Sequence, residues 1–187
     1  LTRLMQYSAQ LYGRLEAETG QATEWKPVGS LRLASSPERW SELKRMATTA
    51  RSFDFELHTL SPKEAQERFP LISPEGIVGA VFVPTDGSVE PSSLTMAYAK
   101  GARAGGVRIV ENVLVTGFET AGRRITRVLT DQGAIACEIV VNAAGIWARD
   151  VAHMAGVKVP AGAVEHQYLI TEKSEAIPKG LPTLRDP

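Results

Sequence analysis

One segment constrains the fold more than any other: an apolar run that ends in small residues and passes directly into a helical pattern. It reads Val140-Val141-Asn142-Ala143-Ala144-Gly145-Ile146-Trp147-Ala148-Arg149. An uninterrupted apolar run is typical of a strand buried on both faces of a sheet. Small side chains after such a strand let the backbone approach another group closely, and the amino end of a helix favours a negative ligand. A strand-to-helix junction of this kind favours an α/β architecture.

The junction has two interpretations on spacing alone. A bound dinucleotide is one group that small residues at this place would admit. The alternative is an ordinary tight junction in which Gly145 only relieves crowding. The glycines at 101, 105 and 106 do not form a phosphate-binding loop, because they follow a helical pattern. The G-x-G-x-x-G loop of dinucleotide-binding proteins follows a strand and opens a helix.

Before the junction, the pattern predicts an antiparallel meander. The connecting residues Ala121-Gly122 and Asp131-Gln132-Gly133 have turn chemistry. We expect strands over residues 112–120, 123–130 and 134–142, the last running into a helix over 146–155. A further strand is expected over 164–171, followed by an irregular, proline-rich tail.

In the first 110 residues, helical and strand patterns alternate. Ser36-Pro37 opens one helix, and Ser61-Pro62-Lys63-Glu64 has the form of a capping box that opens another. Further helices are expected from residue 1 to Gly20 and from Pro91 to Gly105. Strands are expected over residues 28–34, 55–58, 77–83 and 107–110. We therefore predict a mixed α/β (α+β) chain with more than one sheet.

Composition excludes several classes of protein. The 21 Lys and Arg residues balance 21 Asp and Glu residues, so there is no net charge to favour nucleic acid or an anionic membrane. No apolar run is long enough to span a bilayer, and LTRLMQYSAQ has no signal-peptide pattern. One cysteine and three scattered histidines exclude a disulfide and predict no metal site. We expect a cytoplasmic location, and an internal piece of a longer protein, since Leu1 already stands within a helical stripe.

Several stretches, in a consistent order, resemble one family. They are residues 111–118, the Gly122-Arg123 turn, the junction at 140–149, and the stretches 86–91, 154–157, 166–168 and 181–187. Together they resemble the FAD-dependent oxidoreductases of the D-amino acid oxidase and sarcosine oxidase superfamily, in particular the branch of dimethylglycine and sarcosine dehydrogenases. The resemblance implies an FAD-binding part with an antiparallel meander and a substrate-binding part with a mixed sheet and helices. Residues 1–24 and 91–157 would belong to the first part, and residues 25–90 and 158–187 to the second.

The resemblance also assigns candidate site residues. Val115 would lie against the adenosine part of FAD through its backbone, and Ala143, Gly145 and Trp147 would meet the cofactor at the junction. His166 and Tyr168 are two apart on an expected strand, so they would face the same side and could orient an amine or a carboxylate. An ordinary half-exposed strand is the alternative for that pair, although the resemblance places it in the substrate-side sheet. No catalytic residue is identified.

The activity that the resemblance implies is oxidation of a small N-methyl amine, such as dimethylglycine or sarcosine, by hydride transfer to flavin. A folate-dependent domain is a possible partner within the parent protein, and the mitochondrial matrix the location in a eukaryote. The family's amino-terminal glycine-rich loop, the histidine that attaches FAD covalently in this branch and the carboxy-terminal glycine-rich segment have no match here. We therefore expect this fragment alone to be inactive and not to retain FAD.

Two alternatives remain open. One is another substrate in the same superfamily, such as a D-amino acid, a proline-like imino acid or glycerol 3-phosphate. The other is a cofactor-free scaffold domain that uses the same fold.

Overall fold

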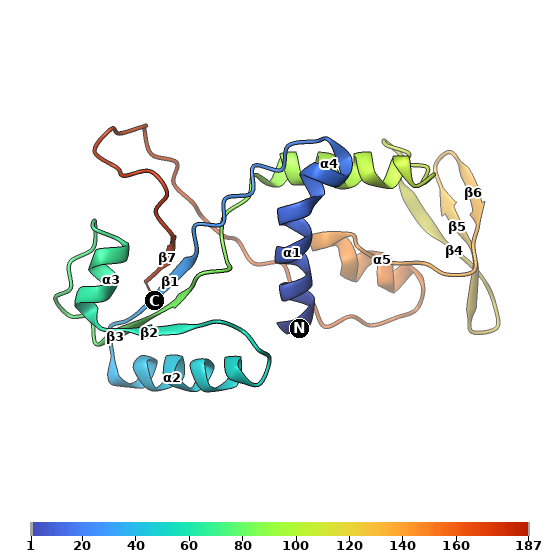
Figure 1. Ribbon diagram of the computed structural model, residues 1–187. Helices are drawn as coiled ribbons and strands as arrows, with labels where there is room; N and C mark the ends of the chain where they lie inside the picture. The colour runs from blue at the N-terminus through green and yellow to red at the C-terminus, as the bar shows by residue number, and fades with distance from the viewer. Residues whose placement is uncertain (1, 187) are drawn as a thin grey trace. The chain divides into compact units, whose positions relative to one another are not determined.

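The computed structural model describes residues 2–186 (Figure 1). They form two compact units. The first consists of residues 2–108 together with 173–186, and the second of residues 109–172.

A four-stranded mixed sheet is the centre of the first unit. Its strand order is β2 (His58–Leu60), β3 (Gly79–Val83), β1 (Ser30–Ala34) and β7 (Thr183–Arg185). β3 pairs antiparallel with both β1 and β2, whereas β1 and β7 are parallel. The sheet confirms the mixed α/β class. The expectation of an irregular carboxy-terminal tail is wrong at β7, which pairs with a strand about 150 residues earlier.

Both faces of this sheet carry a helix, because β1 and β3 alternate two sets of apolar side chains across the sheet plane. On one face Leu31, Leu33 and Phe82 cluster with Ala65 of α3 (Pro62–Arg68). On the other face Val81 clusters with Leu43 of α2 (Pro37–Arg51). Figure 1 shows α2 and α3 beside β2 and β3. This double cover explains why β3 is buried along its whole length.

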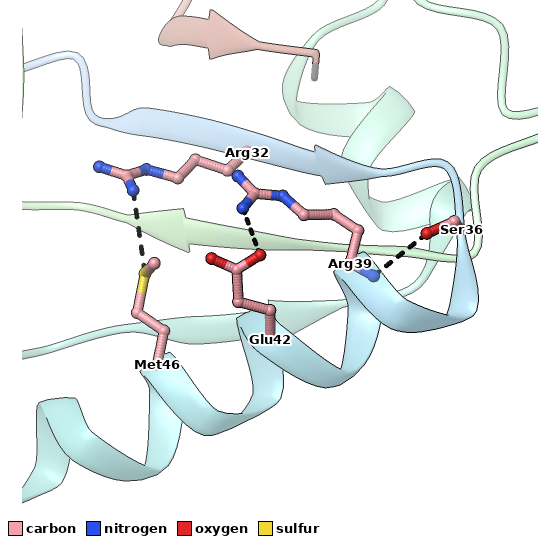
Figure 2. Close-up of polar contacts among 5 residues, drawn as sticks. All are labelled: Arg32, Ser36, Arg39, Glu42 and Met46. Atoms are coloured by element: carbon pink, nitrogen blue, oxygen red, sulfur yellow. Dashed lines mark hydrogen bonds and ion pairs between the residues drawn. The ribbon is translucent and has the colours of Figure 1, made fainter.

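The helix starts follow the predicted capping chemistry. The Ser36 hydroxyl accepts a hydrogen bond from the Arg39 amide at 3.1 Å, at the start of α2 (Figure 2). At α3 the Ser61 hydroxyl accepts from the Glu64 amide, and the Glu64 carboxylate accepts from the Ser61 amide at 2.7 Å. The capping box predicted from the sequence is confirmed.

The remaining helices of the first unit pack against each other. They are α1 (Thr2–Thr19) and α4 (Pro91–Ala104). Tyr12 of α1 meets Trp25 and Tyr98 edge to face, with ring centroids 5.6 Å and 6.4 Å away. Gly20 ends α1 at φ +64°, a left-handed conformation that glycine adopts without strain.

The second unit contains the predicted meander. β4 (Val115–Ala121), β5 (Arg124–Thr130) and β6 (Gly133–Ala136) form an antiparallel sheet in that order. A single 3₁₀ turn, η1 (Gly145–Trp147), leads into α5 (Ala148–Met154), which contacts β4. The helix expected over 146–155 is therefore a 3₁₀ turn followed by a short α-helix.

Two expected strands are wrong, because residues 107–110 and 164–171 have no strand conformation. The third meander strand, expected over 134–142, ends at Ala136 as β6, and residues 138–142 are not part of it. The apolar end of the expected strand is instead exposed, with Ile139 82% and Val141 84% accessible. A strand buried on both faces needs hydrogen-bonded neighbours at its edges, and within residues 2–186 no strand pairs with this segment.

The observed pairings bear on the predicted division into parts without deciding it. Strands from residues 25–90 and 158–187 share one sheet, and α1 contacts α4. The compact units, however, divide after residues 108 and 172. The assignment of parts to FAD and to substrate stays a prediction.

Candidate functional site

All six candidate site residues belong to the second unit. The cofactor-side candidates lie on two elements in contact, because Val115 begins β4 and the junction leads through η1 into α5, which packs on β4. Val115 is half-buried and pairs with Thr130 of β5. The fold therefore brings the Val115 strand close to the element that follows the junction.

Hydrogen bonds from the β5–β6 turn fix the chain just before Val115. The Leu114 amide donates to the Asp131 carboxylate at 3.0 Å, and the Asp131 amide donates to the Leu114 carbonyl at 3.0 Å. The Gln132 side-chain amide donates to the Asn112 carbonyl at 2.9 Å. The sequence indicated Asp131 and Gln132 only as turn residues, and nothing in the pattern connected them with Val115.

Asn142 holds the junction itself. Its Oδ1 accepts from the Ala144 amide at 3.2 Å, and its Nδ2 donates to the Ala148 carbonyl at 2.8 Å. The side chain thus spans the loop that carries Ala143 and Gly145. Asn142 is part of the sequence motif, and its residue type is the one signal for this role, because asparagine commonly makes such local bonds to the backbone.

The junction is open above Gly145 and apolar around it. Gly145 has φ +56°, and a Cβ placed there would meet nothing within 4 Å, so the glycine serves the backbone turn and not a close contact with this chain. Trp147 is 64% exposed, and its neighbour Ile146 is also exposed. Large apolar side chains that lie together on a protein surface usually mark a site that binds another molecule.

The helix after the junction contributes little to anion binding. α5 has seven residues, no side-chain cap, and Asp150 in its first turn. The Asp150 carboxylate opposes the favourable interaction with a negative ligand that the sequence suggested for this helix end.

His166 and Tyr168 lie in a segment without regular secondary structure, and Tyr168 is 82% exposed. The expected placement of both side chains on one side of a strand is therefore wrong. Their role toward substrate stays a prediction from the resemblance.

The described part of the chain offers neither a cluster of metal ligands nor a membrane-spanning helix. Among residues 2–186, no three His, Cys, Asp or Glu side chains are grouped so as to hold a metal ion. None of the helices described is both long enough and apolar enough to cross a membrane.

Comparisons with known proteins agree with this architecture. The chain is 40% identical to dimethylglycine dehydrogenase of Rattus norvegicus over 182 residues, which are 96% of this chain and 21% of that protein. It is 38% identical to sarcosine dehydrogenase of Mus musculus over 189 residues, 98% of this chain and 20% of that protein. It therefore spans about a fifth of the length of these curated relatives.

The fold is similar to that of L-proline dehydrogenase from P. horikoshii. The TM-score is 0.76, with 33% identity, over 83% of this chain and 41% of that one. The family model described as FAD dependent oxidoreductase matches residues 1–187. The chain belongs to the FAD-dependent oxidoreductase family.

Proposed function

We propose that this chain is part of an FAD-dependent enzyme that oxidises a small N-methyl amine, with dimethylglycine or sarcosine as the model substrate. The identity of 38–40% to a sarcosine and a dimethylglycine dehydrogenase, across nearly the whole chain, carries this proposal. Because the chain spans only about a fifth of those proteins, residues 1–187 alone are not expected to turn over substrate.

The junction is compatible with a dinucleotide cofactor. The space above Gly145 would admit a group that no side chain of this unit fills, and exposed Trp147 and Ile146 offer an apolar face next to it. Flat aromatic groups, such as those at both ends of FAD, gain most from such a surface. When bound, FAD supplies an acceptor for the hydride that leaves the N-methyl carbon of the amine.

The chain's own residues would bind and position. Val115 offers backbone groups at the start of β4, and Asp131 holds the preceding residue in place. Asn142 keeps the loop at Ala143 and Gly145 in one conformation. A loop that is already held in one conformation loses less conformational entropy when a ligand binds.

His166 and Tyr168 are the proposed substrate-side groups. A neutral imidazole and a phenol can each donate or accept a hydrogen bond, and so hold a carboxylate or an uncharged amine. An uncharged amine is required because the nitrogen lone pair forms the C=N bond of the iminium as hydride leaves the N-methyl carbon, and a protonated nitrogen has no such lone pair.

We also propose a small-molecule amine partner, a folate-dependent domain within the longer protein, and a location in the cytoplasm, or in the mitochondrial matrix in a eukaryote. Both curated relatives are mitochondrial proteins by name, which supports the mitochondrial location in a eukaryote.

The visible absorption of the purified full-length protein tests the function. We expect flavin bands, and bleaching of these bands when dimethylglycine or sarcosine is added without oxygen. Bands that stay oxidised with both amines would contradict the substrate. A colourless protein that FAD does not reconstitute would contradict the enzyme and favour the scaffold alternative.

An imino acid such as L-proline is the second candidate substrate. The observation that favours it is the fold similarity, at 33% identity, to a protein named L-proline dehydrogenase. In the same anaerobic experiment, bleaching with L-proline and not with the N-methyl amines would select this alternative. D-amino acids and glycerol 3-phosphate serve as the remaining comparisons.

A further inference from the structure

Two arginines lie side by side on one face of the four-stranded sheet. β1 and β7 are parallel, and their register pairs Arg32 with Arg185 and Ser30 with Thr183. Partners in register on neighbouring strands are about 4.8 Å apart and point to the same face. Two like charges in this position repel each other and destabilise the sheet unless an opposite charge compensates them.

The side chains of this unit compensate the pair only in part. The only hydrogen-bond acceptor of the Arg32 guanidinium among the described residues is the Met46 sulfur, at 3.9 Å from Nη1 (Figure 2). A thioether is a weak acceptor, whereas a guanidinium has five donors to satisfy. The Arg185 side chain makes no hydrogen bond or ion pair among residues 2–186.

The opposite charge that acts on Arg32 belongs to Asp86. Burial lowers the pKa of Arg32, Arg185 lowers it further, and Asp86 acts in the opposite direction. Arg39 also adds positive potential, but its Nη1 is paired with the Glu42 carboxylate at 2.7 Å (Figure 2). Arg32, Arg185 and Asp86, the charged residues that line the adjoining cleft, together carry a net charge of one positive unit.

The two arginines face a cleft of about 330 Å³ between β1, β7 and the turn at Asp86-Gly87. Ser30 and Thr183 line the same cleft. Ser30 is 93% buried, and its Oγ has no hydrogen-bond partner in the described part of the chain. A buried hydroxyl without a partner is costly, so it is an independent sign that a polar ligand belongs here.

We propose that the Arg32–Arg185 cleft binds a carboxylate. A guanidinium matches the two oxygens of a carboxylate in a fork, with short, charge-assisted hydrogen bonds. One negative charge neutralises the cleft, whereas a doubly charged phosphate would leave an excess beside Asp86. The carboxylate belongs either to a free small molecule or to an acidic side chain of another segment.

The inference does not rest on the proposed activity. The cleft lies wholly in the first unit, and none of its lining residues is among the candidate cofactor or substrate residues of the second unit. If the protein does not oxidise amines, the proposed carboxylate cleft still stands. If the cleft binds no carboxylate, the proposed amine oxidation still stands.

Side-chain Nε–Hε signals in NMR spectra of the ¹⁵N-labelled chain test the proposal. The protein is titrated at constant ionic strength, adjusted with chloride, using acetate, a blocked Gly-Asp-Gly peptide or inorganic phosphate. We expect saturable shifts of the Arg32 and Arg185 signals with a carboxylate, and weaker binding of phosphate. Saturation by acetate alone identifies a free small carboxylate, and saturation by the peptide alone identifies an acidic side chain.

Arg185→Gln should weaken carboxylate binding about tenfold, which is the size expected for one charged hydrogen-bonding group. Arg185 is exposed on an edge strand, so the rest of the spectrum should stay unchanged. Arg51→Gln, at the exposed end of α2, is the matched control and should leave the titration unaltered. The proposal would be overturned if the Arg32 and Arg185 signals shifted linearly with carboxylate concentration, by as much as the Arg51 signal does. It would also be overturned if phosphate bound as tightly as acetate.

Discussion

At the scale of single residues, Gly79 shows how closely the first unit is packed. A Cβ on Gly79 would lie 2.9 Å from three atoms of the Trp40 indole, which is held by α2 above a fully buried strand. Gly79→Ala should therefore force the indole or the strand to shift, and we expect it to lower the free energy of unfolding by about 1–3 kcal/mol. Chemical denaturation followed by Trp fluorescence measures this change.

Gly162→Ala is the control for that substitution. A Cβ at Gly162 meets nothing within 4 Å, and the backbone there has no positive φ. We expect its effect to stay within about 0.5 kcal/mol. Equal changes in the free energy of unfolding for the two variants would show that contact with Trp40 does not restrict the side chain at position 79.

The candidate site shows what residue patterns predict and what they do not. The junction at Gly145 is visible in the sequence because small residues follow an apolar run, whereas Trp147 is a candidate through the family resemblance. The residues that fix the site, Asp131 and Asn142, are not visible in this way, since their hydrogen bonds depend on the loops that the folded chain brings near them. Polar residues are common in turns, and the neighbouring sequence does not specify which distant group each of them will hydrogen-bond.

At the scale of an element, the capping box of α3 makes stability depend on pH. Hydrogen bonds from the Ser61 hydroxyl and then from the Ser61 amide hold the pKa of Glu64 below its usual value of 4.5. The folded state therefore favours the ionised carboxylate, and the unfolded state binds the proton more readily. The stabilisation is present above about pH 4.5 and is lost as the pH falls through the lowered pKa.

Denaturation of wild type and Glu64→Gln, from about pH 6 down to about pH 3, tests this effect. We expect the wild type to be the more stable protein at the upper end, and the difference to shrink on acidification. Glu67→Gln removes an exposed charge from the same helix, outside the capping box, and should not reproduce the change. A difference that is constant over the whole range would contradict a role for the Glu64 charge.

Elements with local signals were predicted, and elements that depend on distant partners were not. Ser36-Pro37 and the Ser61 capping box specify helix starts within a few residues, and both are confirmed. β7 was missed because it has three residues and exists through pairing with β1. The strand expected over 134–142 ends at Ala136 for the converse reason, because the apolar pattern of residues 138–142 requires neighbours that do not pair with it within residues 2–186.

At the scale of the whole molecule, the two units differ in how much core they possess. The apolar clusters around Leu31 and Leu43 belong to the first unit, whereas within residues 109–172 Ala152 is the one buried residue. Many large apolar side chains of the second unit are instead exposed, among them Val141, Trp147 and Leu169. Local opening free energies follow the amount of buried apolar contact, so the second unit should open at lower cost.

Amide hydrogen exchange of the 187-residue chain measures that difference. We expect peptides from β1 and β3 to exchange slowly, near the rate set by global unfolding, and peptides from β4–β6 to exchange faster by a factor of about 10 or more. Backbone hydrogen bonds are present in both sheets, so the contrast would report burial and not secondary structure. If β4–β6 were protected as strongly as β1 and β3, the apolar surface at the junction would have to be covered in solution, for example by self-association. Repeating the exchange at a tenfold lower protein concentration separates these cases, because protection from self-association falls on dilution and protection from an internal core does not.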